Sequence, residues 1–145
     1  MEAVAEPIVS GPLFRLNTEL RRRLQQELAN EPWLAESGVR APCVAVLKMI
    51  EMRGPVSQRE IAEALLVDPS DLVALLDVLE DSGFLQRQRD PGDRRRNAVV
   101  LTEKGLEATN RAMALAARAE AAALARLSDA QRAQLGRLIS AAIGD

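Results

Sequence analysis

The chain has 145 residues, a length suited to one domain, and its apolar and charged fractions of 48% and 28% are those of a globular protein. The net charge of −2 excludes a uniformly basic surface but allows a local basic patch. The sequence has no His and a single Cys, Cys43, which excludes a His-centred catalytic triad, a His metal site, a zinc site built on Cys pairs and an intrachain disulfide.

Residues 1–12 show no periodic pattern and end in Ser10-Gly11-Pro12, so they predict a flexible arm. The first seven residues are acidic, where a secretory signal would be basic. No apolar run approaches the roughly 18 residues that span a bilayer. Together with the single thiol, these features indicate a cytoplasmic protein without a membrane partner.

The next two segments carry helical patterns. Leucines recur every three or four residues over 13–30, which predicts an amphipathic helix that ends at Asn30-Glu31-Pro32. A second helix is predicted from Pro42 to the break at Gly54-Pro55, because proline suits a first helical turn.

Two short helices joined by a tight turn follow. Ser57-Gln58-Arg59-Glu60 is a capping box that starts the first of them. Asp68-Pro69 starts the second, which is predicted over 69–82 and ends at Gly83 as a left-handed cap. Two helices joined in this way predict a helix-turn-helix.

The pattern then changes to that of a β-hairpin. Residues 84–89 and 97–101 are predicted as strands, with Asp90-Pro91-Gly92-Asp93 as the turn. A helix is predicted over about 103–126, and 10 of residues 106–125 are Ala. At about 36 Å it is long for a small lobe, and its small side chains favour close packing on a partner subunit.

A last helix, started by a capping box at Ser128, is predicted to end near residue 143. The order of elements therefore predicts a mainly α fold in which residues 13–145 form one domain. Its centre is a winged helix-turn-helix lobe over about 42–102 with a small β-hairpin wing. The helices at about 13–30 and 103–143 are predicted to be N- and C-terminal dimerisation helices.

The hairpin over 84–98 concentrates positive charge, because it holds five arginines against two aspartates, and three consecutive arginines lie at its tip. The arginines are Arg87, Arg89, Arg94, Arg95 and Arg96. Long cationic side chains on a projecting tip suit phosphates and the narrow minor groove, where negative potential is focused. A solvated turn that prevents edge-to-edge pairing of strands is the alternative.

These motifs resemble those of the MarR family of bacterial transcription regulators. The resemblance rests on residues 57–62, 79–87, 90–96 and 101–105 and extends over about 13–143. The wing signature of the family is Asp-any-Arg before a strand that ends in Leu-Thr-any-any-Gly. The residues that match it in order and spacing are Asp93, Arg95, Leu101, Thr102 and Gly105.

The resemblance implies a homodimeric regulator, a repressor or an activator, that binds double-stranded DNA. The helix at 69–82 would enter the major groove and the wing would enter the minor groove of a pseudo-palindromic operator. The matched positions assign Arg95 to the minor groove and Asp93 to its orientation or to the turn. Arg94 and Arg96 would then reach phosphates.

The helix at 69–82 lacks the exposed Arg or Lys that the family commonly carries there. A helical wheel places the candidate DNA-binding residues outward or at its edge: Ser70, Asp71, Val73, Ala74 and Asp77. Asp71 most simply stabilises the start of the helix, and Asp77 is either a solvated residue or an acceptor for a cytosine amino group. Hydroxyl and methyl contacts from Ser70, Val73 and Ala74 remain, so we expect affinity to depend mainly on the wing and on backbone amides.

Many members of the family release DNA when a small aromatic or anionic effector binds between the dimer core and the DNA-binding lobe. The corresponding cleft here is expected near Trp33, Arg40, Val46 and Leu47, although a lone Trp is more often core filling. Cys43 is expected to be a small buried hydrophobe and not a redox sensor.

A winged-helix module that binds protein instead of DNA is the alternative function, because the helix at 69–82 is acidic. An enzyme is disfavoured, since the sequence has no paired-nucleophile motif and no glycine-rich phosphate loop. Metal-responsive regulation is disfavoured because such sites draw on Cys and His. No cofactor is expected.

Overall fold

The computed structural model describes residues 8–90 and 92–145, and the side chains of Asp90 and of residues 94–96 lie outside that description. The described residues form seven helices and three strands in the order α1 (Ser10–Ala29), α2 (Pro32–Glu36), α3 (Ala41–Arg53), β1 (Val56–Ser57), α4 (Gln58–Leu65), α5 (Pro69–Asp81), β2 (Leu85–Asp90), β3 (Asp93–Leu101), α6 (Glu103–Ala123) and α7 (Asp129–Ile143).

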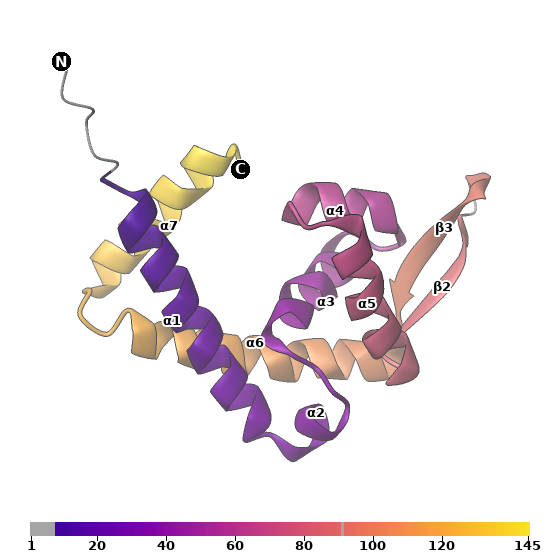
Figure 1. Ribbon diagram of the computed structural model, residues 1–145, viewed down its shortest axis with the longest axis horizontal. Coiled ribbons are helices and arrows are strands. Elements are labelled where there is room, and N and C mark those ends of the chain that lie inside the picture. Colours follow the sequence, from indigo (N-terminus) through magenta and orange to yellow (C-terminus); the bar gives the residue numbers. More distant parts are fainter. Residues whose placement is uncertain (1–7, 91) are drawn as a thin grey trace.

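The fold is a winged helix-turn-helix lobe carried on a pair of long helices, which confirms the predicted mainly α class (Figure 1). The three strands form an antiparallel sheet in the order β1-β3-β2, in which Val56 pairs with Val99 and Leu85 with Leu101. The sheet extends into the β2–β3 wing, which projects from the lobe beside α5 (Figure 1).

The hydrophobic core lies between α3, α4, α5, the sheet and α6, and the end of α1 and the helix α2 also contribute to it. Its largest fully buried side chains are Phe84, Leu28, Leu34, Leu47, Ile50, Ile61, Leu72, Leu76, Leu79, Leu85, Val46 and Val99. They come from separate helices and strands, so one continuous core fixes α5 and the base of the wing relative to each other.

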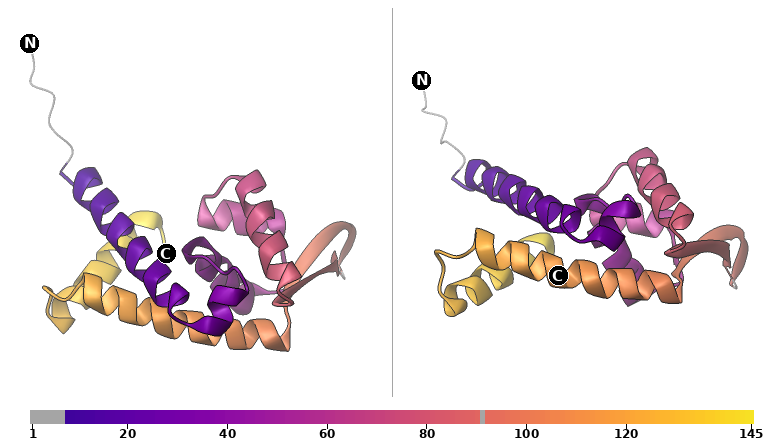
Figure 2. Two further views of the ribbon diagram at one scale, coloured as in Figure 1. Left: turned by 60° about the horizontal axis from the view of Figure 1, so that its bottom comes forward. Right: turned by 90° about the horizontal axis from the view of Figure 1, so that it is seen from below.

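The long helices α1 and α6 lie side by side and extend away from the lobe (Figure 2). Ala108, Ala112 and Ala119 of α6 are buried within the chain, so part of the alanine-rich face packs on the chain's own helices. We call α1, α6 and α7 together the helical arm, which is distinct from the predicted flexible arm at residues 1–12. The helix α7 lies at the end of the helical arm, the same end as the start of α1 (Figure 1). None of its residues is buried.

The first helix begins at Ser10, so residues 10–12 are helical and the predicted arm is too long at its carboxyl end. Pro12 is compatible with this start because the N–H groups of a first helical turn have no intrahelical acceptor. Of the rest of the predicted arm, residues 8–9 are described and exposed, and residues 1–7 lie outside the described residues.

The short helix α2 and the short strand β1 were not predicted from the sequence. The carboxylate of Glu31 accepts a hydrogen bond from the Leu34 N–H at 2.7 Å, and Pro32 occupies the first turn of α2. The Pro32 that was interpreted as the end of one helix therefore also starts the next. The strand β1 spans only Val56–Ser57, which is too short for an alternating pattern.

Candidate nucleic-acid interface

The helices α4 and α5 form the predicted helix-turn-helix, and side-chain caps fix where each begins. The Ser57 hydroxyl accepts from the Glu60 N–H at 3.1 Å, and the Ser57 N–H donates to the Glu60 carboxylate at 2.8 Å. The Asp68 carboxylate accepts from the Ser70 N–H at 2.8 Å and from the Ser70 hydroxyl. These bonds hold the pKa of Asp68 below its usual value, so it stays ionised at the start of α5.

The face of α5 that points away from the core carries every residue predicted for it. The exposed side chains are Ser70, Asp71, Val73, Ala74 and Asp77. On the opposite face, Leu72, Leu76 and Leu79 are buried, which sets the rotation of the helix. The exposed face offers one hydroxyl, two carboxylates and small apolar groups.

Arg87, predicted as a wing contact, is held at the base of the wing by side chains of α4 and α5. Its guanidinium donates to Gln58 at 2.9 Å, to Glu80 at 2.9 Å and to Asp77 at 2.8 Å. The side chain is only 20% exposed. Arg87 therefore neutralises acidic side chains of α5, a pairing that periodicity in the sequence does not reveal because the partners are not local in the chain.

The rest of the wing matches the prediction in its backbone. Strands β2 and β3 pair so that Arg89 lies opposite Asn97, and both Arg89 and Asp93 are exposed. The backbone of residues 94–96 belongs to β3, which is longer than the predicted strand over 97–101. The predicted phosphate and minor-groove roles of the Arg94, Arg95 and Arg96 side chains lie outside the described residues.

The wing is anchored on α6 by the residues of the Leu-Thr-any-any-Gly motif. The Thr102 hydroxyl donates to the Gly83 carbonyl at 2.6 Å and accepts from the Gly105 N–H at 3.0 Å. A Cβ atom at Gly105 would lie 1.8 Å from the carbonyl oxygen of Phe84, so no side chain fits there. The glycine of the motif is therefore a packing requirement.

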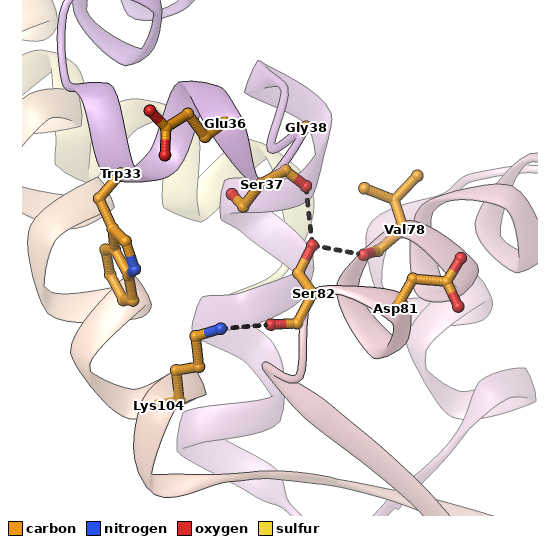
Figure 3. A pocket seen from close by; sticks show the side chains of 8 residues that line it. All are labelled: Trp33, Glu36, Ser37, Gly38, Val78, Asp81, Ser82 and Lys104. Carbon is orange, nitrogen blue, oxygen red and sulfur yellow. Dashed lines mark hydrogen bonds between the residues drawn. The ribbon is translucent and has the colours of Figure 1, made fainter.

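Trp33 lies where α2, α5 and α6 meet, beside a surface hollow of about 610 Å³ (Figure 3). The Arg111 guanidinium stacks on its ring at 4.6 Å, and the ring of Phe84 lies 5.4 Å away. The Ser82 hydroxyl donates to the Ser37 carbonyl at 2.7 Å across the hollow, and the Lys104 ammonium donates to the Ser82 carbonyl at 2.9 Å. Trp33 is half-buried and serves both as core filling and as a wall of the hollow.

The four residues predicted to line an effector cleft are not brought together. Arg40 is exposed before α3, and Leu47 is fully buried in the core. Val46 lines a second hollow, of about 530 Å³, between the long helices and the lobe. The residues around that hollow are Asn17, Leu20, Arg21, Leu24, Ala41, Pro42, Ala45, Val46, Leu65, Val67, Leu75, Ala116, Ala119 and Glu120.

Cys43 is fully buried, as expected of a small apolar side chain. Burial raises the pKa of its thiol, because the thiolate would lose its hydration.

Within residues 8–90 and 92–145, no helix is long and apolar enough to cross a membrane. The same residues contain no group of three or more acidic or Cys side chains placed to hold a metal ion.

Residues 37–96 match the sequence profile described as MarR family. YkoM of Bacillus subtilis (strain 168), named an uncharacterized HTH-type transcriptional regulator, is 34% identical over 100 residues, which cover 69% of this chain and 65% of YkoM. A putative transcriptional regulatory protein for the hcr operon of Thauera aromatica is 35% identical over 68% of this chain and 59% of its own length. The chain thus spans less than two thirds of these relatives.

A solved structure is similar over nearly the whole chain. The PcaV transcriptional regulator of Streptomyces coelicolor, in complex with its natural ligand, has a TM-score of 0.75 and 27% identity, with 99% of this chain and 98% of PcaV covered. Its similarity extends beyond the lobe to the long helices.

Proposed function

Because the chain belongs to the MarR family of winged helix-turn-helix transcriptional regulators, which are not enzymes, we propose that it is a sequence-specific double-stranded DNA-binding repressor that acts as a homodimer. The observation that carries the proposal is the exposed face of α5 beside a projecting wing, on a lobe whose core fixes both. In this arrangement α5 enters the major groove and the wing reaches the adjacent minor groove.

The apolar end of the arm supports a homodimer. The side chains exposed there include Val9, Leu13, Phe14, Leu138, Ile139 and Ile143. An amphipathic helix with no buried residue, such as α7, gains little stability from its own chain. A second copy that covers this end would relate two α5 helices by a two-fold axis, and the operator would be a pseudo-palindrome with half-sites about one helical turn apart.

DNA selection from random fragments tests this proposal directly. Purified protein should enrich a pseudo-palindromic sequence, and footprinting should show two protected half-sites. Light scattering should return about twice the mass of 15.8 kDa. Enrichment of no sequence would favour the acidic face of α5 as a protein-binding surface instead, and protection of a single half-site would contradict the dimeric complex.

The wing arginines are proposed to have different contacts: Arg95 inserts into the minor groove, and Arg94 and Arg96 contact phosphates. We expect Arg95→Ala to cost about 1–3 kcal/mol of binding free energy and to flatten any preference for A·T-rich flanks, since a narrow groove attracts Arg through its shape. Arg94→Ala should weaken binding to all DNA equally. It should also lower the salt slope, which is the magnitude of the slope of the logarithm of the binding constant against the logarithm of the salt concentration, by about one. Equal binding by the parent and Arg95→Ala at several salt concentrations would remove the wing as the anchor.

A small aromatic carboxylate is the proposed effector, bound in the hollow lined by Val46. That hollow touches α1 and α6 on one side and the lobe on the other, so a ligand there would fix their relative position. Arg21 supplies a cation beside apolar walls. Rv2887 of Mycobacterium tuberculosis, whose structure was solved with salicylic acid, is 26% identical to this chain with a TM-score of 0.72, and the match covers 93% of this chain and 96% of Rv2887.

Salicylate in a gel shift tests this effector site. We expect salicylate to release DNA from the parent and from Arg22→Gln, an arginine of α1 that pairs with Glu19 and does not line the hollow. Arg21→Gln should need a much higher concentration. Equal release from both variants would exclude Arg21 as the carboxylate partner.

A further inference from the structure

Arg87 engages three different side chains although it lies in a wing expected to contact DNA. Its Nε atom donates to Gln58, its Nη1 atom to Glu80 and its Nη2 atom to Asp77, all at 2.8–2.9 Å. Its backbone N–H also lies 3.3 Å from the second carboxylate oxygen of Glu80. Charge-assisted bonds of this number hold a guanidinium more firmly than a single phosphate contact would.

These bonds join three elements of the DNA-binding lobe, namely α4, α5 and β2. Gln58 belongs to the first turn of α4, Asp77 and Glu80 belong to α5, and Arg87 belongs to β2. The guanidinium is 20% exposed, against 58% for the Asp77 carboxylate and 41% for that of Glu80. Arg87 is therefore the least exposed residue of the two ion pairs, and Asp77 is the one most accessible to a ligand.

Asp77 lies on the exposed face of α5, where a free carboxylate would repel the phosphates of DNA. The ion pair with Arg87 offsets that charge and holds Oδ1, which restricts the direction of the carboxylate. A carboxylate that is both oriented and partly neutralised is a hydrogen-bond acceptor for a neutral donor.

The hydrogen-bonding groups on the base edges determine which base donates to the Asp77 carboxylate. Cytosine presents its N4 amino group in the major groove with no acceptor on the same base beside it, whereas adenine presents N6 next to the acceptor N7. A carboxylate has no hydrogen to give to N7, so it favours cytosine. Ala74, one turn earlier on the same face, leaves room for the base to approach.

We infer that Arg87 is a positioning residue of the DNA interface, not a phosphate contact, and that it holds Asp77 as the acceptor for the N4 amino group of one cytosine in each half-site. This inference rests on the proposed DNA-binding function. It adds a specificity-determining residue to a helix face that otherwise offers few polar groups to bases.

The first arm of the test is Asp77→Asn in a selection from random DNA. Asn has nearly the shape of Asp and keeps an acceptor for Arg87, so the fold is preserved. An amide pairs with N6 and N7 of adenine through two bonds, so the preferred base at one position of each half-site should change from cytosine to adenine. The parent should prefer cytosine at that position by about tenfold.

The second arm compares two arginines of the same strand. Arg87→Ala should reduce the cytosine preference at that position and leave the salt slope unchanged, because no phosphate contact is lost. Arg87→Lys should restore part of the preference, since an ammonium pairs with Asp77 but lacks the planar, multiply donating geometry of a guanidinium. Arg89→Ala, at the exposed arginine two residues along β2, should lower the salt slope by about one and leave every base preference intact.

Each result decides between the two proposals. A parent that enriches no DNA sequence overturns the proposed function itself. A parent that selects an operator while Asp77→Asn keeps the same base preferences overturns the role of Asp77. A fall in the salt dependence of binding for Arg87→Ala equal to that for Arg89→Ala makes Arg87 a phosphate contact and overturns its positioning role. If Arg87→Ala is not a folded dimer, the neutral variant Arg87→Gln, which keeps an amide donor for the carboxylates, gives the same comparison.

Discussion

The helices α5 and α7 both have a capped start and an apolar face, but they differ in what covers that face. They have 13 and 15 residues, and a side-chain oxygen of Asp68 or Ser128 caps the start of each. The apolar face of α5 buries Leu72, Leu75, Leu76 and Leu79 in the core of the lobe. The apolar face of α7 buries nothing, and its Leu138 is 62% exposed.

The difference shows that an apolar stripe predicts that a face is covered, without saying by which chain. The lobe is a complete core in one copy, because its leucines meet side chains from α3, α4 and the sheet. The end of the arm has the same kind of stripe without that cover. We therefore expect substitutions in α5 to act on folding of the chain and substitutions in α7 to act on association.

The largest expected effect separates the two helices through matched leucines. Leu76→Ala removes a fully buried side chain and should lower the free energy of unfolding by about 2–5 kcal/mol. Leu138→Ala should leave the folded monomer intact and weaken the dimer, so its effect on unfolding should grow as the protein is diluted. Urea unfolding at two protein concentrations, with light scattering, measures both.

The comparison would fail if Leu138→Ala remained a dimer at every concentration with unchanged unfolding. The face of α7 would then be solvent-exposed in the working protein. A loss for Leu76→Ala smaller than that for Leu138→Ala would likewise contradict the assignment of the core to one chain.

Apart from the short elements α2 and β1, the order of helices and strands was predictable because local chemistry marks their ends. Both capping boxes, at Ser57 and Ser128, form as predicted, and Gly83 adopts the positive φ of 78° expected of a left-handed cap. The exposed residues of α5 were also predictable, because buried leucines fix its rotation. Regular periodicity and caps depend on neighbours in the chain, so one sequence is enough to read them.

Contacts between distant segments were not predictable in this way. The pairing of Arg87 with Gln58 links residues 29 positions apart, and the stacking of Arg111 on Trp33 links residues still further apart. No periodic pattern records such partners. For the same reason the predicted effector cleft combined Leu47, which is in the core, with Val46, which lines a hollow.

Two glycines, Gly105 of α6 and Gly136 of α7, differ in what surrounds them. A Cβ at Gly105 meets the Phe84 backbone, so Gly105→Ala should displace the start of α6 and cost about 1–3 kcal/mol of stability. Gly136 of α7 has nothing within 4 Å, so Gly136→Ala should stabilise the monomer by up to about 1 kcal/mol through helix propensity. Circular dichroism during thermal unfolding gives both values, and destabilisation by Gly136→Ala would indicate that this position is covered in the proposed dimer.

The two capping boxes allow a smaller, chemically matched test. Ser57→Ala and Ser128→Ala remove the same bond, to the N–H of Glu60 and of Gln131, and each should cost about 1 kcal/mol of helix stability. The first loss should appear in unfolding of the lobe, whereas the second should appear as a weaker dimer. Hydrogen exchange of α4 and α7 amides distinguishes them, and equal effects of both variants on the dimer would contradict the division into lobe and arm.

The smallest expected effect concerns Glu31, where α2 joins the arm to the lobe. The Leu34 N–H, and then the Arg111 guanidinium, hold the pKa of Glu31 below its ordinary value of 4.5. A carboxylate whose folded pKa is lowered adds stability above its ordinary pKa, and this contribution disappears as the pH falls through the folded value. Glu31→Gln should therefore be less stable than the parent at pH 7, and the difference should shrink as the pH falls below the ordinary value of 4.5. Other acids with lowered pKa values, such as Glu19 and Asp68, are present in both proteins and cancel in the comparison. Urea unfolding followed by Trp33 fluorescence at several pH values measures the difference, and a constant difference at all pH values would assign it to packing instead of charge.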